Sequence, residues 1–153
     1  MKELISILFC FLLLGNGLFS QTNDNTKKFP ANKDEKAKFD EAQLLMTEQD
    51  YEYAFEIFKA LDEGNPGHVE LLFPLAVCSQ NFENGNEAAI SYFEKINLED
   101  VRGSEFSFYY AISLHKAYRF QQAIDQLNTF LKESKPSKEQ KENANKLINH
   151  CKN

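Results

Sequence analysis

The sequence predicts an all-α fold: a solenoid of three helix pairs followed by a C-terminal capping helix. A short phrase recurs along the chain, apolar residues elsewhere follow helical spacing, and no segment alternates with period two long enough for a strand. Each phrase places an alanine four residues before a large apolar residue, and the three alanines are 35 and 34 residues apart. A fixed period of this length is typical of stacked helix pairs. The alanines are Ala54, Ala89 and Ala123.

Residues 1–20 have the pattern of a signal peptide. Lys2 precedes an apolar run over residues 4–14, and Ser20 supplies a small residue for cleavage. We therefore expect cleavage after Ser20 and a periplasmic or secreted location, with membrane contact only through this segment before cleavage. The run is shorter than the span of about 20 residues that crosses a bilayer, which argues against an uncleaved anchor. Lipidation at Cys10 is also disfavoured, because Cys10 lies inside the apolar run.

Residues 21–34 are polar, contain Pro30, and predict a flexible linker. Three repeats are then expected over residues 35–135, at about 35–68, 69–102 and 103–135. The expected helices run from 35 to a turn at 49–50, then over 51–62, 69–82, 87–96, 105–116 and 120–133, with a capping helix within 136–153.

Particular residues set the expected helix ends. Pro74 falls inside the third helix and should kink it or delay its start. Pro136 ends the third pair, and Ser137 is placed to cap the last helix. That helix has one apolar stripe and is otherwise polar, which suits the terminal cap of a repeat array.

Charge is unevenly distributed along a chain of net charge -6. Acidic side chains outnumber basic ones 16 to 6 over residues 33–102, whereas basic ones outnumber acidic ones 6 to 3 over residues 132–153. An acidic surface argues against nucleic acid as a partner, because phosphates require the opposite charge.

Two cysteines remain after cleavage, Cys78 and Cys151. An exported protein meets an oxidising compartment in which a disulfide is allowed. Both residues also fall on apolar helical patterns, where buried free thiols are common. The sequence leaves both alternatives open.

The repeats resemble the tetratricopeptide repeat over about residues 35–135. Small residues occupy the first helices at Ala42, Ala76 and Ala111, the phrase alanines begin the second helices, and Pro66 stands at the closing position of repeat one. The early tryptophan of the family pattern is absent from all three repeats, and Pro136 comes one residue late. The resemblance implies a right-handed superhelical solenoid that holds other proteins.

A narrower likeness lies in LLFPLAVCSQ and YYAISLHKAYRFQQAIDQLNTFLK. These segments resemble the N-terminal repeat module of OmpA-like envelope proteins of gliding bacteria with type IX secretion. Such relatives commonly carry a β-propeller-like segment and a peptidoglycan-binding domain after the repeats. Residues 1–153 contain neither, so the likeness implies only a scaffolding role for the repeats.

A groove is expected on the first helices of the three pairs, which line the concave side of such arrays. Phe39, Phe73 and Phe108 recur at spacings of 34 and 35 residues, three residues before the small alanines. They are interpreted either as an aromatic ladder that grips a peptide or as packing between repeats. The expected partner-binding residues are Phe39, Gln43, Met46, Phe73, Val77, Gln80, Asn81, Phe108, Ile112, His115 and Lys116.

Signals for catalysis are poor. His68, His115 and His150 lie far apart in the sequence, and no HExxH, CxxC or GxSxG motif or glycine-rich phosphate loop occurs. A thiol dyad of Cys78 with His115 is disfavoured because Cys78 should point into the packing. No spacing supports a metal site, and we expect neither an enzyme nor a cofactor.

The sequence therefore predicts an exported interaction module that binds a protein segment, as an envelope scaffold or accessory factor. The alternative is a structural subunit that stacks with another solenoid or self-associates, because three repeats are near the minimum for a stable array.

Overall fold

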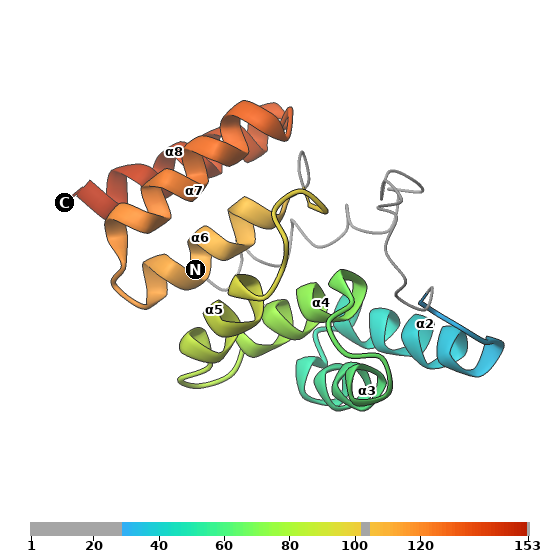
Figure 1. Cartoon of the computed structure of the whole chain (residues 1–153). Coiled ribbons are helices and arrows are strands. Elements are labelled where there is room, and N and C mark those ends of the chain that lie inside the picture. The colour runs from blue at the N-terminus through green and yellow to red at the C-terminus, as the bar shows by residue number, and fades with distance from the viewer. Residues whose placement is uncertain (1–28, 102–104, 153) are drawn as a thin grey trace.

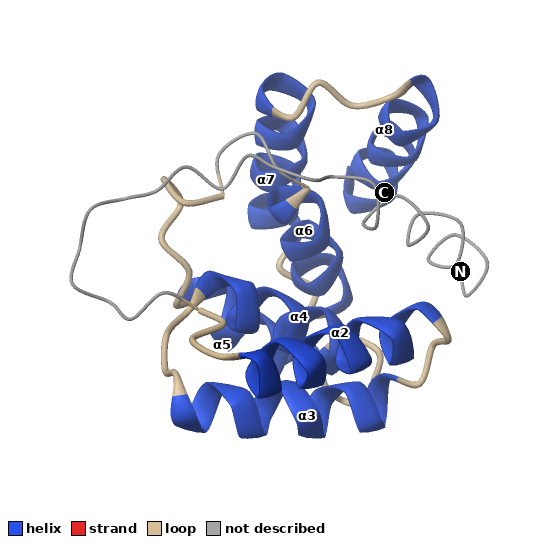
Figure 2. Cartoon of the chain, turned by 90° about the vertical axis from the view of Figure 1, so that its right-hand side faces the viewer, coloured by secondary structure: helices blue, strands red, loops and turns tan. Residues whose placement is uncertain are grey.

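A computed structural model of the protein describes residues 29–101 and 105–152, and these residues form seven α-helices and no strand (Figures 1 and 2). The all-α prediction is thus confirmed. The expected signal peptide and residues 21–28 of the expected linker lie outside the described residues.

The helices follow one another as pairs, and the extensive helix contacts all join neighbours in the sequence. Helices α2 to α5 form one part of the molecule, and α6 to α8 lie above them in the view of Figure 1. The bounds are α2 Lys33–Thr47, α3 Tyr51–Gly64, α4 Val69–Ser79, α5 Asn86–Glu94, α6 Phe106–Lys116, α7 Phe120–Glu133 and α8 Lys138–Lys152.

Each pair has a residue of positive φ in the turn between its two helices. Gln49, Asn84 and Tyr118 have φ values of 65°, 60° and 60°, in the left-handed region that most residues avoid. Each lies five residues before a phrase alanine, so the left-handed residue recurs with the period of the sequence. The turns of the first and third pairs also share a hydrogen bond, from the Asp50 amide to the Leu45 carbonyl and from the Arg119 amide to the Leu114 carbonyl, whereas the turn between α4 and α5 is longer. Between pairs, Gly67 and Lys135 also have positive φ, and they are 68 residues apart, which is two periods.

The phrase alanines mark places where helices approach closely. Ala54, Ala89 and Ala123 are 0% exposed, and the small residues of the first helices, Ala42, Ala76 and Ala111, are as deeply buried. A side chain of one carbon lets neighbouring backbones come together, and the interior has no space for a larger group.

The expected flexible linker extends too far, because its last residues are packed on the helices. Phe29 is only 6% exposed, and its ring lies 5.6 Å from that of Phe39 and 5.7 Å from that of His68. The side chain of Asn32 accepts a hydrogen bond from the amide of Glu35 and so caps α2, which begins at Lys33.

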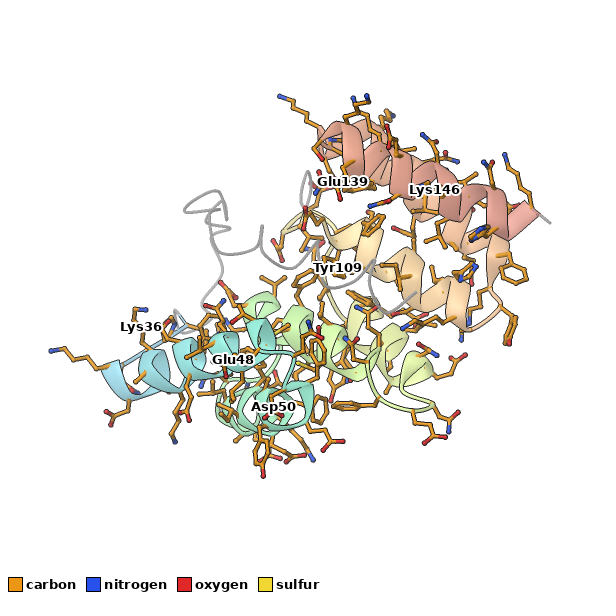
Figure 3. All side chains as sticks on the ribbon, turned by 180° about the vertical axis from the view of Figure 1, so that it is seen from behind. Lys36, Glu48, Asp50, Tyr109, Glu139 and Lys146 are labelled. Carbon is orange, nitrogen blue, oxygen red and sulfur yellow. The ribbon has the colours of Figure 1, made fainter. Side chains whose placement is uncertain are left out.

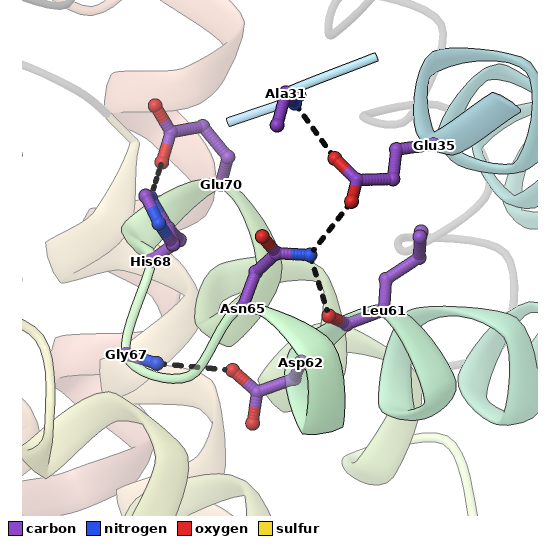
Figure 4. A network of polar contacts seen from close by, with 8 residues as sticks. All are labelled: Ala31, Glu35, Leu61, Asp62, Asn65, Gly67, His68 and Glu70. Carbon is purple, nitrogen blue, oxygen red and sulfur yellow. Dashed lines mark hydrogen bonds and ion pairs between the residues drawn. The ribbon is translucent and has the colours of Figure 1, made fainter. Parts of the chain in front are cut away.

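A polar network fixes this N-terminal arm to the turn between α3 and α4 (Figure 4). The Glu35 carboxylate accepts hydrogen bonds from the Ala31 amide at 2.7 Å and from Asn65 Nδ2 at 3.4 Å. Asn65 Nδ2 also donates to the Leu61 carbonyl at 3.2 Å. The Ala31 bond lowers the pKa of Glu35 below its ordinary value against the opposing effect of burial, and hydrogen bonds from Asn65 and Asn32 add to the lowering.

Pro74 does not delay its helix, because α4 begins at Val69 and continues through the proline. The helix ends at Ser79 and not at Phe82, since the amides of Asn81 and Phe82 bond to carbonyls three residues earlier. Helix α5 likewise ends at Glu94, followed by similar tightened turns. The predicted ends were therefore displaced by a few residues where α-helix gives way to tighter turns.

The last helix has the predicted cap. Ser137 Oγ accepts a hydrogen bond from the Gln140 amide at 3.2 Å, and Gln140 Oε1 accepts one from the Ser137 amide at 2.8 Å. This reciprocal pair satisfies two amides at the start of the helix. Ala144, Ile148 and Cys151 face the core, which leaves a polar outer surface on α8.

The buried side chains form two clusters. One occupies α2 to α5 and reaches α6, and the other joins α5 and α6 to α7 and α8. Cys78 belongs to the first cluster and Cys151 to the second, and both are free thiols.

Candidate functional site

The expected groove residues lie on α2, α4 and α6 or, for Gln80 and Asn81, directly after α4, but the structure does not expose them equally. Gln43 is exposed, and Phe39, Phe73 and Ile112 are partly buried. His115, Lys116 and Asn81 are also partly buried. Met46, Val77, Gln80 and Phe108 are buried.

Each ring of the expected ladder packs on the second helix of its own pair. The ring centroids are 5.6 Å apart for Phe39 and Phe58, and 6.1 Å apart for Phe73 and Phe93. Phe108 lies 5.1 Å from Phe130 and is only 6% exposed. Periodicity correctly placed the three rings at equivalent positions, but Phe108 is a core residue because α7 covers it.

Three of the polar residues expected at the groove form bonds within the protein. The ammonium of Lys116 donates to the Gln80 backbone carbonyl at 2.8 Å, and Ser113 Oγ donates to Gln80 Oε1 at 3.3 Å. Asn81 Nδ2 donates to the Val77 carbonyl at 2.8 Å. Gln80 and Lys116 therefore hold α4 against α6, and burial lowers the pKa of Lys116.

The exposed residues at the turn between α6 and α7 were not singled out from the sequence. Tyr118 is 81% exposed and Phe120 is 38% exposed. The ring of Phe120 lies 5.9 Å from that of Tyr118 and 5.6 Å from that of His115. The available signal was Tyr118, an aromatic residue at the position where the other two pairs have Gln49 and Asn84. We call His115, Tyr118 and Phe120 the turn cluster.

Both basic and acidic groups lie around the turn cluster. The pKa of His115 is lowered, first by partial burial and then by the nearby positive charges of His150 and Lys116. Arg119, in the same turn, binds two carboxylates of α5, with its guanidinium 2.7 Å from Glu87 and 3.7 Å from Glu94. One guanidinium thus faces two carboxylates at this turn.

Charge is separated along the molecule as the sequence predicted. Figure 3 labels Lys36, Glu48 and Asp50 on the first pair, and Glu139 and Lys146 on α8 at the other end, so each end carries charges of both signs and the separation is one of excess. The last turns of α6 and α8 carry basic residues, whereas those of α2 to α5 carry none.

The buried thiol of Cys78 and the buried hydroxyl of Tyr109 both resist ionisation. Burial raises the pKa of the Cys78 thiol to about 12, so the nucleophilic thiolate is scarce at neutral pH. Burial also raises the pKa of Tyr109, whose hydroxyl has no hydrogen-bond partner among the described residues. In the same part of the chain, no three His, Cys, Asp or Glu side chains gather at a spacing that could hold a metal ion. None of the helices described is long and apolar enough to span a bilayer.

Comparison of the chain with protein-family models, curated proteins and solved structures found no match. The assignment of a function therefore depends on the geometry of the helices and their surfaces.

Proposed function

We propose that the chain is an exported protein-interaction module, a right-handed superhelical solenoid of three tetratricopeptide-like pairs that binds a protein segment. The observation that carries this proposal is the recurrence of a left-handed residue, at Gln49, Asn84 and Tyr118, five residues before each phrase alanine. Helix pairs that repeat in this way present their first helices side by side as an extended binding surface.

Contacts between first helices support this arrangement. Phe73 of α4 lies 5.6 Å from Tyr109 of α6, ring centroid to ring centroid. Lys116 and Ser113 of α6 both bond to Gln80, directly after α4. The proposed binding surface keeps those expected residues that are exposed or partly buried, which are Phe39, Gln43, Phe73, Asn81, Ile112, His115 and Lys116.

Site-specific photo-crosslinking tests the binding surface. A photoreactive residue at position 43 or 112 should give discrete adducts in envelope extract, and one at the exposed Lys59 of α3 should not. Equal labelling from all three positions, or none from 43 and 112, would contradict the proposal. Far-UV circular dichroism of each variant ensures that only folded protein is compared.

Export is tested separately by mass spectrometry of the protein made in its own host. The expected mature N-terminus is Gln21, after removal of residues 1–20. Retention of the apolar run over residues 4–14 would contradict export by this route.

The separation of charge favours a second candidate, a structural subunit that self-associates. Acidic groups of α2 and α3 and basic groups of α8 would then meet between copies, giving head-to-tail association. Sedimentation at low ionic strength should show concentration-dependent growth that added salt reverses. A monomer at all concentrations and salt levels would exclude it.

A further inference from the structure

We propose that the joint between the second and third helix pairs is a hinge, which stays fastened near the turns of these pairs and opens beside Tyr109. The joint is the contact of α6 with α4 and α5. Opening would widen the face of α4 and α6 on which Phe73 lies. The use of the hinge in binding therefore rests on the proposed function, whereas the motion itself does not.

Polar bonds fasten the joint near the turns of the two pairs. The ammonium of Lys116 donates to the Gln80 carbonyl at 2.8 Å, and Ser113 Oγ donates to Gln80 Oε1 at 3.3 Å. The Arg119 guanidinium, in the turn after α6, lies 2.7 Å from the Glu87 carboxylate at the start of α5. All three donors lie in or just after the last turn of α6, so this end of the joint can act as the pivot.

Aromatic rings hold the other end of the joint, at the first turns of α6. The ring of Tyr109 lies 5.6 Å from that of Phe73 on α4, and the ring of Phe106 lies 5.4 Å from that of Phe93 on α5. Tyr109 and Phe106 are only 3% and 2% exposed. Burial of these rings favours the closed form, so the open form is the minor state.

The polar side chains at this end favour opening. The Tyr109 hydroxyl is buried and has no hydrogen-bond partner among the described residues. The Glu105 carboxylate, one turn earlier, accepts a hydrogen bond from Gln140 of α8, which lies on its own side of the joint. A buried hydroxyl without a partner disfavours the closed form because it has lost its bonds to water, and opening would restore them.

The hydrophobic packing also divides at this joint. Of the contacts between successive helices, the one between α5 and α6 is the least extensive. The two buried clusters meet on α6, which contributes Phe106 and Tyr109 to the first cluster and Leu114 to the second. A rotation of α6 to α8 as one body would therefore leave the second cluster largely intact, and would uncover mainly the rings at the first turns of α6.

Distances between spin labels on the two sides of the joint test the hinge. Azide-bearing residues carry the nitroxides at exposed positions: Glu63 and Glu139 for the opening end, and Glu83 and Gln122 for the turn end. The protein is the chain over residues 21–153, which contains all the helices described. Double electron–electron resonance should resolve two distances for the first pair, the longer one in the minor population, and one distance for the second pair.

Two adjacent tyrosines supply matched variants. Tyr109→Phe removes only the hydroxyl without a partner, so the ratio of open to closed form should fall about tenfold and the melting temperature should rise. Tyr110→Phe removes the same atom from the next residue of α6, but this hydroxyl donates to Glu94 of α5 at 3.5 Å. The ratio of open to closed form should therefore not fall in Tyr110→Phe.

Four outcomes would overturn the inference. A single distance between labels at 63 and 139 would show that the joint does not open, and two distances for both label pairs would show that the parts separate without a pivot. A lower melting temperature for Tyr109→Phe would show that the hydroxyl has a partner, such as a buried water. Equal open populations in the two variants would exclude Tyr109 as the cause. None of these results bears on crosslinking from positions 43 and 112, so the two proposals fail independently.

Discussion

Among Gly64, Gly67 and Gly85, Gly85 is the one at which substitution by alanine should lower the stability of the protein most. A Cβ on Gly85 would lie 1.9 Å from the carbonyl oxygen of Ser79 and 2.9 Å from its carbonyl carbon. Real Cβ atoms essentially never come within 3.0 Å of another group, and both of these atoms are backbone. The end of α4 and the start of α5 would therefore have to move apart by about 1 Å.

The cost can be estimated from the bonds at this turn. Overpacking of a well-packed site costs about 1–3 kcal/mol. The displaced turn also includes the hydrogen bond from the Phe82 amide to Ser79 and the one from the Ala89 amide to Gly85, at 3.0 and 2.9 Å. Weakening them adds about 1 kcal/mol. Gly85→Ala should thus remove about 2–4 kcal/mol of a total near 5–15 kcal/mol, and lower the melting temperature by roughly 10 °C.

Two other glycines are matched controls. Nothing lies within 4 Å of a Cβ on Gly64, the last residue of α3, so Gly64→Ala should be neutral or stabilising by up to about 1 kcal/mol. Gly67 also has open space but a φ of 85°, so Gly67→Ala should cost about 1–2 kcal/mol through strain alone. The stability of all three variants is measured by urea denaturation, with the loss of helix monitored by far-UV circular dichroism. Equal midpoints for Gly85→Ala and Gly64→Ala would refute the steric argument.

Five further substitutions test the packing and the pH dependence of stability. Ala54→Arg forces a charged side chain into a fully buried site and should unfold the module, which circular dichroism would show directly. Phe108→Ala should cost about 3–5 kcal/mol and Phe73→Ala, at a partly buried site, less; urea midpoints in the opposite order would contradict the assignment of Phe108 to the core. Phe29→Ala should destabilise the chain and speed amide hydrogen exchange at the start of α2, whereas exchange in α8 should not change. Because the pKa of His115 is lowered in the folded state, the unfolded chain binds its proton more tightly, so stability should fall as the pH drops below about 6.5, and His115→Gln should reduce that slope in a pH series of midpoints.

Much of the fold could be read from local features of the sequence. The phrase alanines predicted close helix approach because only a small side chain permits it, and all three are buried. Ser137 predicted the start of the last helix because a hydroxyl there satisfies a free amide, and that bond is present. Features of this kind depend on neighbours within a few residues.

The errors arose where contacts between distant residues decide the outcome. Phe29 stands in a polar segment, and nothing local shows that its ring would pack on Phe39 and His68. Spacing placed Phe108 on the inner side of its helix, but its burial depends on how closely α7 covers that side. The exposure of Tyr118 was missed because periodicity describes helices and says little about the turns between them.

The sequence of helix contacts also bears on how fast the chain folds. Each helix packs mainly on the one before it and the one after it, so most contacts close short loops at little entropic cost. Helical proteins with such local contacts fold in microseconds to milliseconds. The pair α4 and α5 has a neighbouring helix on each side, so structure that begins there can spread in both directions. The outermost helix, α8, packs mainly on α7 and should join last and open first, with its amides exchanging ahead of those in the central pair.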